Sequence, residues 1–401
     1  MWEQIRGNRT KTMVLVAAMA GVLLGIGYAI GFLFFGSPIG GLFIALIIWG
    51  VMTLVAYFKG DNIFLSISRA RKIERDDHPR LYNIVEEMKI ASGLEYMPAI
   101  YIIDDPAMNA FATGRDPKKA AVAVTSGLLQ KLNRDELQGV IGHEIAHVKN
   151  RDVLLMTMCG VLLGTIVMIS YYMTHMMFWS SMSGGRRSSG GGGGPAMIVV
   201  LIVGIVLMIL APILARLIYY AISRKREYLA DATSAQYTRY PEGLASALEK
   251  LAGSTVPLQS ANQALAPMYI TNPFRKKGKA ASDLSSTHPP ISERVRILRA
   301  MGGASFSDYN SAYNSVHKGG GSVMPATALA GSGLVGIRAA SSESAIGEPS
   351  KLERSREVSD LMWKKSNYKM INCSCGTKLK VPPNIKKFTI KCPHCGTQHS
   401  V

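Results

Sequence analysis

The sequence predicts an α+β polytopic membrane protein with four transmembrane helices, a mainly helical domain that includes a small sheet, and a small β domain near the C-terminus. Three observations lead to this fold class. Apolar residues make up 48% of the 401 residues although the formal charge is +18, a combination that soluble globular domains rarely show. Four long uncharged apolar runs divide the chain, and two closely spaced pairs of cysteines lie near its C-terminal end.

The four apolar runs are each near or above the roughly 20 residues that cross a hydrocarbon core of ~30 Å. They cover residues 13–35, 39–58, 153–179 and 196–215. Only "GSP" separates the first two, so residues 1–58 are expected to form a transmembrane hairpin. A cleaved signal peptide is the alternative for the first run, because Arg6, Arg9 and Lys11 precede it. The run is, however, longer than the roughly 7–15 apolar residues of a signal peptide.

Lysine and arginine are concentrated on one side of these runs. The N-terminal segment, "SRARKIER" at 68–75 and "SRKRE" at 223–227 are basic, whereas the turn at 36–38 is uncharged and the loop at 180–195 has only two arginines. Lysine and arginine are retained on the cytoplasmic side of a membrane. We therefore expect a multi-pass protein of the cell (inner) membrane whose termini and large polar parts are cytoplasmic.

The sequence between the second and third runs has a mixed, globular character. Apolar residues at helical spacing predict a helix over 78–92 that ends at Gly93. Two short strands are expected at 98–104 and 120–127, separated by the turn-rich stretch 104–119.

Further helices, interrupted by a loop, are expected over residues 216–300. Together with membrane helices at 153–179 and 196–222 they complete a domain that we place at 59–317. The stretch 318–350 is rich in glycine, alanine and serine and has no regular period, so it predicts a flexible linker.

A strong helix is expected over 133–150, because Asn133 can cap its N-terminus and a glutamate follows three residues later. This helix contains "HEIAH". His143 and His147 are four residues apart and share one face, where both can bind a zinc ion at about 2.0–2.1 Å. Glu144 lies beside that position and can take a proton from a water molecule whose pKa zinc lowers toward ~7. A chance pattern on a solvated helix face is the alternative.

A catalytic zinc ion needs a third protein ligand and an open position. Glu227 and Asp231 lie on one helical face just after the fourth apolar run. We expect Glu227 to be the third ligand, and a charged residue at a helix start is the alternative. Asp231, and less strongly Asp152, can hold the second ring nitrogen of a ligand histidine. Two crossings separate His147 from Glu227, so the three ligands are expected on the same side of the membrane.

Five stretches of the chain, in this order, resemble the HtpX-type membrane zinc metallopeptidases, which are relatives of the Ste24 prenyl-protein peptidases. These stretches are "NAFATG", "VAVTSGLL", "DELQGVIGHEIAHVKNRD", "EYLADATSA" and "THPPISERVRIL". The resemblance covers about residues 10–300. It implies a gluzincin-like (zincin-like) metallopeptidase fold and a role in proteolytic quality control of membrane proteins. It also implies that His143, His147 and Glu227 bind zinc, with Glu144 as the catalytic base.

The resemblance further implies which residues line the substrate cleft. It places Asn109, with Ala110 and Phe111, beside that cleft, although asparagine is also a common turn residue. It places "THPPISERVRIL" near the active site, where His288 can stabilise the oxyanion or cover the metal in a resting form. Arg294 in the same stretch is a candidate for substrate binding. A simple helix start after two prolines is the alternative for this stretch.

The C-terminal segment 351–401 is basic, with eleven lysines and arginines against three acidic residues, and predicts a zinc ribbon. Four thiolates can form a closed structural zinc site, which so small a domain needs for stability. They belong to Cys373, Cys375, Cys392 and Cys395. The first pair is C-x-C where C-x-x-C is usual. The basic charge can attract anionic lipid or an acidic protein and, less readily, nucleic acid, while a solubilising tail is the alternative.

These features predict a zinc-dependent membrane endopeptidase with one catalytic and one structural zinc ion, acting on proteins or peptides and especially on misfolded or surplus membrane proteins. If the strand at 120–125 lies at the sheet edge, it offers unpaired backbone groups to an extended substrate, and sequence preference should be loose. Two alternatives are a non-catalytic membrane scaffold that uses the ribbon to recruit a partner, and a prenyl-protein peptidase. The small number of membrane runs argues against the latter.

Overall fold

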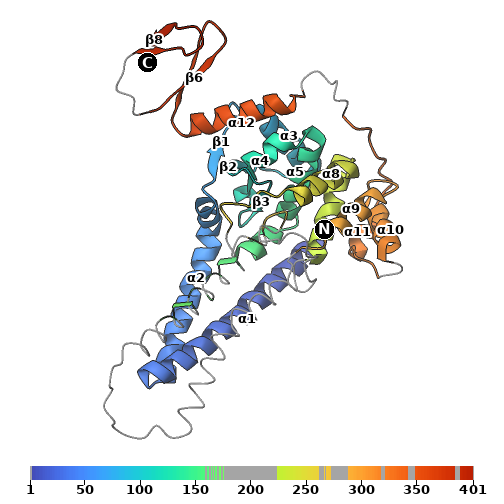
Figure 1. Ribbon diagram of the computed structural model, residues 1–401. Coiled ribbons are helices and arrows are strands. Elements are labelled where there is room, and N and C mark those ends of the chain that lie inside the picture. The colour runs from blue at the N-terminus through green and yellow to red at the C-terminus, as the bar shows by residue number, and fades with distance from the viewer. Residues whose placement is uncertain are drawn as a thin grey trace.

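Figure 1 shows the computed structural model of the protein. The structure describes residues 2–158, single positions between 160 and 175, and residues 224–261, 266, 268–271, 288–317, 321–341, 348–383 and 389–400. The third and fourth predicted membrane helices, at 153–179 and 196–222, lie outside the described residues except for helical residues 153–158 and single positions up to 175.

Helices α1 (Trp2–Phe35) and α2 (Pro38–Ile67) form a long hairpin that projects from the rest of the molecule (Figure 1). Glycines let the two backbones approach closely, since a Cβ on Gly41 would lie 2.0 Å from the carbonyl oxygen of Gly27. Both helices contain a segment that is long and apolar enough to cross a membrane. Large apolar side chains on α2 are exposed, as a lipid-facing surface requires. They include Ile39, Phe43, Leu46, Leu54 and Phe58.

The chain after α2 forms a four-stranded sheet in the order β1-β2-β4-β3. Its strands are β1 (Arg71–Ile73), β2 (Ala99–Ile103), β3 (Ala110–Thr113) and β4 (Ala121–Thr125). Strands β2 and β4 are parallel, whereas β1 pairs antiparallel with β2 and β3 pairs antiparallel with β4. Every residue of β3 and β4 is buried, so both faces of this half of the sheet are covered.

The sheet corrects two expectations from the sequence. The stretch 104–119, expected to consist of turns, contains β3. The strand expected at 120–125 was the candidate for the sheet edge, but β4 lies between β2 and β3, so β3 is the edge strand. Four residues of β3 are too few to show a strand period. Its pairing depends on a chain reversal that begins at Gly114, whose φ of +125° favours glycine.

Helices pack against this sheet and against one another. They are α3 (Pro79–Ser92), α4 (Ser126–Lys131), α5 (Arg134–Lys149), an unlabelled helix at 224–238, α8 (Pro241–Gly253), α9 (Ile291–Arg299), α10 (Phe306–His317) and α11 (Ala326–Ala330), with a 3₁₀ turn at Pro117–Lys119. Helix α3 ends at Gly93 with a φ of +64°, as predicted. Helix α5 begins with the predicted capping box, in which Asn133 and Glu136 each accept the other's backbone N–H at 2.9 Å. The main core lies where α5 packs against α3, α8 and β3.

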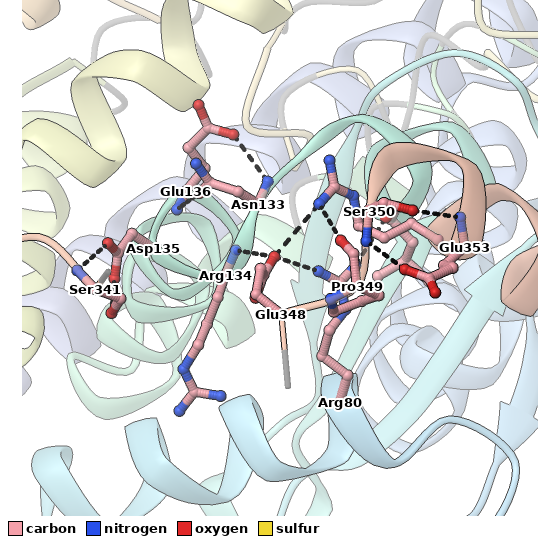
Figure 2. Close-up of polar contacts among 12 residues, drawn as sticks. Arg80, Asn133, Arg134, Asp135, Glu136, Ser341, Glu348, Pro349, Ser350 and Glu353 are labelled. Carbon is pink, nitrogen blue, oxygen red and sulfur yellow. Dashed lines mark hydrogen bonds and ion pairs between the residues drawn. The ribbon is translucent and has the colours of Figure 1, made fainter. Parts of the chain in front are cut away.

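The chain beyond α10 folds back over the N-terminal end of α5 (Figure 2). Arg338 contacts the carboxylate of Asp135 at 2.7 Å, and the backbone N–H of Ser341 donates to the same carboxylate at 2.8 Å. Glu348 accepts a hydrogen bond from the backbone N–H of Arg134 at 3.0 Å. The described parts of the expected linker, 321–341 and 348–350, contain the short helix α11 (Ala326–Ala330) followed by irregular chain, and these contacts attach them to α5.

The C-terminal part begins with α12 (Lys351–Lys365), which packs on α4. Two small antiparallel hairpins follow, and the structure describes them as separate two-stranded sheets. Their strands are β5 (Lys369–Asn372) with β6 (Lys378–Val381), and β7 (Thr389–Lys391) with β8 (Gln398–Ser400). Figure 1 shows them on the opposite side of the molecule from the tip of the α1–α2 hairpin.

Candidate metal centre

The second half of α5 packs closely against helix 224–238, and glycines make this contact possible. A Cβ on Gly142 would lie 2.9 Å from Oγ of Ser234 in helix 224–238. Gly139 serves the neighbouring contact with α8, because its Cβ would lie 2.7 Å from the backbone nitrogen of Leu244. Ser234 also donates a hydrogen bond to the carbonyl of Gly139 at 2.7 Å. The side chains that these two helices direct toward each other therefore meet in the interior.

His143, His147 and Glu227 meet at this interface, and all three are buried. The Nε2 atoms of the two histidines are 3.2 Å apart, and they lie 3.6 Å and 3.5 Å from the two carboxylate oxygens of Glu227. Ligands that hold a tetrahedral zinc ion at about 2.0–2.1 Å are about 3.3 Å from one another, so the three groups fit zinc. Within the described part of the chain Oε2 of Glu227 has no hydrogen-bond partner, which is unusual for a buried oxygen unless it binds a ligand.

The other ring nitrogen of each histidine lies next to a buried aspartate. Nδ1 of His143 is 2.9 Å from Asp231, and Nδ1 of His147 is 3.2 Å from Asp152. Each ring therefore directs Nε2 toward the common point and Nδ1 toward a carboxylate, which is the usual arrangement behind metal-binding histidines. The structure thus places each of the two aspartates named from the sequence next to one of the two histidines.

Glu144 lies next to the two histidines on α5 and is only 1% exposed. Neither of its carboxylate oxygens makes a hydrogen bond of normal geometry within the described residues, although the backbone N–H of Ala112 in β3 interacts with the carboxylate. Burial raises the pKa of this carboxyl group, and the charges of His143 and His147 oppose that rise. A carboxyl group with a raised pKa holds a transferred proton more readily, as a general base that later acts as an acid requires.

Arg294 on α9 is fully buried behind the metal centre. Its Nη2 and Nε atoms donate to Asp231 at 2.6 and 2.8 Å, and Nη1 donates to the carbonyl of Ile270 at 3.3 Å. The same Nη1 lies 3.7 Å from Glu227. Arg294 was predicted to bind substrate, and in this structure its guanidinium contacts Asp231 and the backbone of Ile270.

His288 lies just before α9, with Nε2 3.6 Å from Oε2 of Glu227. It is 5% exposed, and burial lowers its pKa to about 4, a shift that the nearby carboxylate of Glu227 only partly opposes. The imidazole is therefore neutral near pH 7. The structure places His288 next to Glu227, at the edge of the candidate metal centre.

The residues expected beside the substrate cleft lie on and before the edge strand β3. Asn109 is buried, and its Nδ2 donates to the carbonyl of Thr271 at 3.0 Å. Ala110 accepts a hydrogen bond from the backbone N–H of Ile270 at 3.0 Å, and Phe111 is fully buried. The contacts of these three residues are with residues 269–271 of the same chain. The next residue of β3, Ala112, interacts through its backbone N–H with the carboxylate of Glu144, which brings this strand close to the metal centre.

Tyr309 on α10, which was not predicted from the sequence, lies near Asp231 and Arg294 behind the metal centre. Its side chain is fully buried, and no described group accepts or donates a hydrogen bond to its hydroxyl. Burial, together with the carboxylate of Asp231, raises its pKa far above the usual value. A single tyrosine on an amphipathic helix resembles an ordinary core residue, so no local pattern could have indicated this position.

A second cluster of metal-binding groups lies in the C-terminal hairpins. Its four sulfur atoms are all within 4.8 Å of one another, and they belong to Cys373, Cys375, Cys392 and Cys395. Zinc held by thiolates at about 2.3 Å places the sulfurs about 3.8 Å apart, which agrees with separations of 3.3 and 3.8 Å across the hairpins. Although the first turn is one residue shorter, both turns contain a glycine with positive φ, +83° and +78°.

Comparison with known proteins identifies the family. Residues 75–302 match the model of peptidase family M48. The chain belongs to peptidase family M48. The protease HtpX homolog of Dictyoglomus turgidum is 44% identical over 301 residues, which cover 75% of this chain and 95% of that protein. The protease HtpX homolog of Streptococcus thermophilus is 43% identical over 301 residues. This match covers 75% of this chain and the full length of that protein.

A crystal structure of S. mikatae Ste24p superposes with a TM-score of 0.40 and 20% identity, covering 74% of this chain and 67% of that one. The match to the M48 family and to the HtpX proteases makes the protein a metalloprotease. Its histidine and glutamate cluster suits the zinc ion that such an enzyme uses, and its two apolar helices are long enough to cross a membrane.

Proposed function

We propose that this M48 metalloprotease is a zinc-dependent endopeptidase whose ion is held by His143, His147 and Glu227. One observation carries the proposal. The three ligand atoms are 3.2–3.6 Å apart at a buried point that borders Glu144. This set leaves a fourth coordination position for the reaction, as in catalytic zinc sites.

A zinc ion bound there supplies Lewis acidity, which polarises the scissile carbonyl and lowers the pKa of a water molecule. Glu144 takes a proton from the attacking water and passes it to the leaving amine. Asp231 and Asp152 accept the Nδ1–H of the two histidines and so keep both Nε2 lone pairs directed at the ion. His288, which is neutral and beside the site, donates a hydrogen bond to the developing oxyanion.

The proposed substrates are proteins or peptides that bind in an extended conformation beside β3, the strand that replaces 120–125 as the edge of the sheet. Pairing through backbone groups tolerates many sequences. Loose preference suits the removal of misfolded or surplus membrane proteins. The apolar hairpin of the same chain supports a location where such substrates are found.

We further propose two membrane helices at 153–179 and 196–222, which with the hairpin at 1–58 give four crossings. The metallopeptidase domain then extends over 59–317, with the termini and the active site in the cytoplasm of a cell (inner) membrane. An even number of crossings between the α5 histidines and Glu227 supports this topology, because a single zinc site requires all three ligands on one side.

The C-terminal segment 351–401 is proposed to be a zinc ribbon with a structural ion bound by its four cysteines, following the linker at 318–350. Its basic charge suggests an anionic partner. Because the hairpins lie away from the tip of the α1–α2 hairpin (Figure 1), an acidic protein is favoured over an anionic lipid surface.

The test of the proposed function is the substitution Glu144→Gln in the full-length protein, purified in detergent. We expect zinc content to be retained and casein cleavage to fall by about 10²–10⁴-fold, the usual contribution of a general base. Glu86→Gln is the matched control, because Glu86 lies on the surface of α3 and pairs with Arg75 at 2.7 Å. A non-catalytic scaffold predicts no chelator-sensitive cleavage by the wild-type protein. A prenyl-protein peptidase predicts strong preference for prenylated over unmodified peptides, and we expect none.

A further inference from the structure

A short segment, residues 268–271, lies along the free edge of β3 next to the metal centre. Phe111 and Tyr269 form an isolated antiparallel bridge, and the N–H of Ile270 donates to the carbonyl of Ala110 at 3.0 Å. The edge at which an extended substrate is expected to bind is therefore paired with the protein's own chain.

Two polar side chains hold the backbone of this segment. Nη1 of Arg294 donates to the carbonyl of Ile270 at 3.3 Å and lies 3.7 Å from Oε2 of Glu227. Asn109 donates to the carbonyl of Thr271 at 3.0 Å and accepts from its N–H at 3.4 Å. The guanidinium of Arg294 thus connects the carbonyl of Ile270 to a candidate metal ligand. All of these contacts are with backbone groups, which any extended peptide also offers.

The side chains of the segment fill two different apolar clusters. Tyr269 is fully buried and packs edge-on against Phe111, with ring centroids 5.3 Å apart, in a cluster that includes Phe64 of α2. Ile270 is 1% exposed and belongs to the main core. Successive residues of a strand point to opposite faces. Two neighbouring apolar sites therefore flank the edge of β3, one filled by an aromatic ring and one by a branched aliphatic side chain.

We propose that residues 268–271 occupy the place of the substrate, which must displace them, pair with β3 in the same register and take over the contacts of Asn109 and Arg294. This inference rests on the proposed peptidase function and names its substrate class. The preferred substrate is an unfolded apolar segment in which an aromatic residue precedes a branched aliphatic one. Backbone contacts recognise any extended chain, whereas burial of two apolar side chains selects among them. In the resting protein only the fraction of molecules in which this segment is displaced can bind substrate. The apparent affinity for substrate therefore equals the intrinsic affinity multiplied by that fraction.

Hydrogen exchange tests the displacement directly. The protein is full-length Glu144→Gln loaded with zinc, and the probe is a ten-residue peptide with Tyr-Ile at its centre, whose binding is followed by fluorescence anisotropy. At saturation the amides of Ile270 and Thr271 should exchange at least about fivefold faster than in the free protein, since each displaced backbone hydrogen bond contributes about that factor. A peptide with Ser-Ser at the same positions should bind at least about tenfold more weakly, because it cannot replace the buried apolar area.

A substitution gives a second, independent measurement. Ile270→Pro removes the N–H that pairs with Ala110, so it should raise kcat/KM for the Tyr-Ile peptide by about fivefold or more. Leu334→Pro is the control, because Leu334 is fully exposed and far along the chain from the site. If residues 268–271 are instead a permanent strand, Ile270→Pro lowers activity and zinc content together.

The two proposals fail in different ways. Wild-type cleavage of the peptide, combined with unchanged or slower exchange at residues 270 and 271 in the Glu144→Gln complex, would refute the displacement and leave the peptidase intact. Absence of any chelator-sensitive cleavage by the wild-type protein would refute the peptidase function and this inference with it.

Discussion

Asp231 and Asp152 lie behind the two histidines of the metal centre in similar positions, but replacing each by asparagine should have different consequences. Asp152 is 3.2 Å from Nδ1 of His147, and Asp231 is 2.9 Å from Nδ1 of His143. Asp231 in addition accepts two hydrogen bonds from the fully buried guanidinium of Arg294, at 2.6 and 2.8 Å. Asparagine keeps the size of either side chain and removes its charge.

Loss of the carboxylate behind a ligand histidine lowers metal affinity by about 10–100-fold, so both variants should bind zinc about 1.4–2.7 kcal/mol less tightly. Asp231→Asn also leaves a buried arginine without its counter-charge, which costs about 3–5 kcal/mol. In a domain of about 150–250 residues each kcal/mol lowers Tm by about 2–4 °C. The metal-free Asp231→Asn protein should therefore melt about 6–20 °C below the wild type.

Competitive titration against a chromophoric chelator measures the zinc affinity, and differential scanning fluorimetry of EDTA-treated protein in detergent measures Tm. Asp152→Asn is the comparison variant and should also weaken zinc binding. Asp152 lies 4.0 Å from the buried Arg226, a longer ion pair than the 2.6 Å contact of Asp231 with Arg294, so its metal-free Tm should fall less than that of Asp231→Asn. The reasoning is refuted if the two variants melt at the same temperature without metal, or if neither of them weakens zinc binding.

Three further outcomes are expected. Cys392→Ser should remove one zinc ion per chain, measured by mass spectrometry, and leave peptide cleavage intact, because its cluster is separate from the catalytic centre. Arg338→Ala should destabilise the protein mainly above about pH 4. Burial alone would raise the pKa of Asp135, but hydrogen bonds from Arg338 and a neighbouring serine hold that pKa below its usual value. Because the pKa of Asp135 is lower in the folded state than in the unfolded state, its ion pair stabilises the protein above the unfolded-state pKa, and this stability is lost as the pH falls through the folded-state pKa. Denaturant titrations of the wild type and the variant at several pH values measure the difference. Gly139→Ala should cost about 1–3 kcal/mol of unfolding free energy, because its Cβ would lie 2.7 Å from a backbone nitrogen. Gly253→Ala, with nothing within 4 Å, should be neutral or stabilising in the same denaturant assay.

Each of these outcomes has a result that contradicts it. Unchanged zinc content in Cys392→Ser would show that the cysteine cluster does not need all four thiolates. If the wild type remains more stable than Arg338→Ala by the same unfolding free energy at about pH 3 as at neutral pH, Asp135 is not the group involved. Equal costs for the two glycine substitutions would show that α5 and α8 are not in the close contact described.

Local patterns in the sequence predicted the elements that carry the chemistry. Helix α5, its capping box at Asn133 and the shared face of His143 and His147 depend on residues at most a few positions apart. The same holds for the end of α3 at Gly93 and for the two cysteine pairs. Such features are determined by backbone geometry and side-chain chemistry within one turn, so they can be recognised without knowing how the chain packs.

Features that depend on distant contacts were not predictable in this way. The edge position belongs to β3 and not to β4, because strand order is decided by which strands pair after the chain reverses. The contact of Arg294 with Asp231, 63 positions away at 2.6 Å, could not be read from the sequence, which offered Arg294 only as a candidate for substrate binding. The attachment of Arg338 to Asp135, 203 positions apart, was equally invisible in a stretch whose composition suggests only a linker.

The sequence by itself determined which groups are available for chemistry, because the spacing of histidines, acids and thiols along a helix or turn is a local property. Only the tertiary structure decided which of them meet. The close packing of α5 on helix 224–238 brings Glu227 to the histidines, and residues 268–271 pair with the edge of β3 at which we propose that substrate binds. Packing of this kind depends on the shapes of surfaces that lie far apart in the chain, and no single segment contains that information.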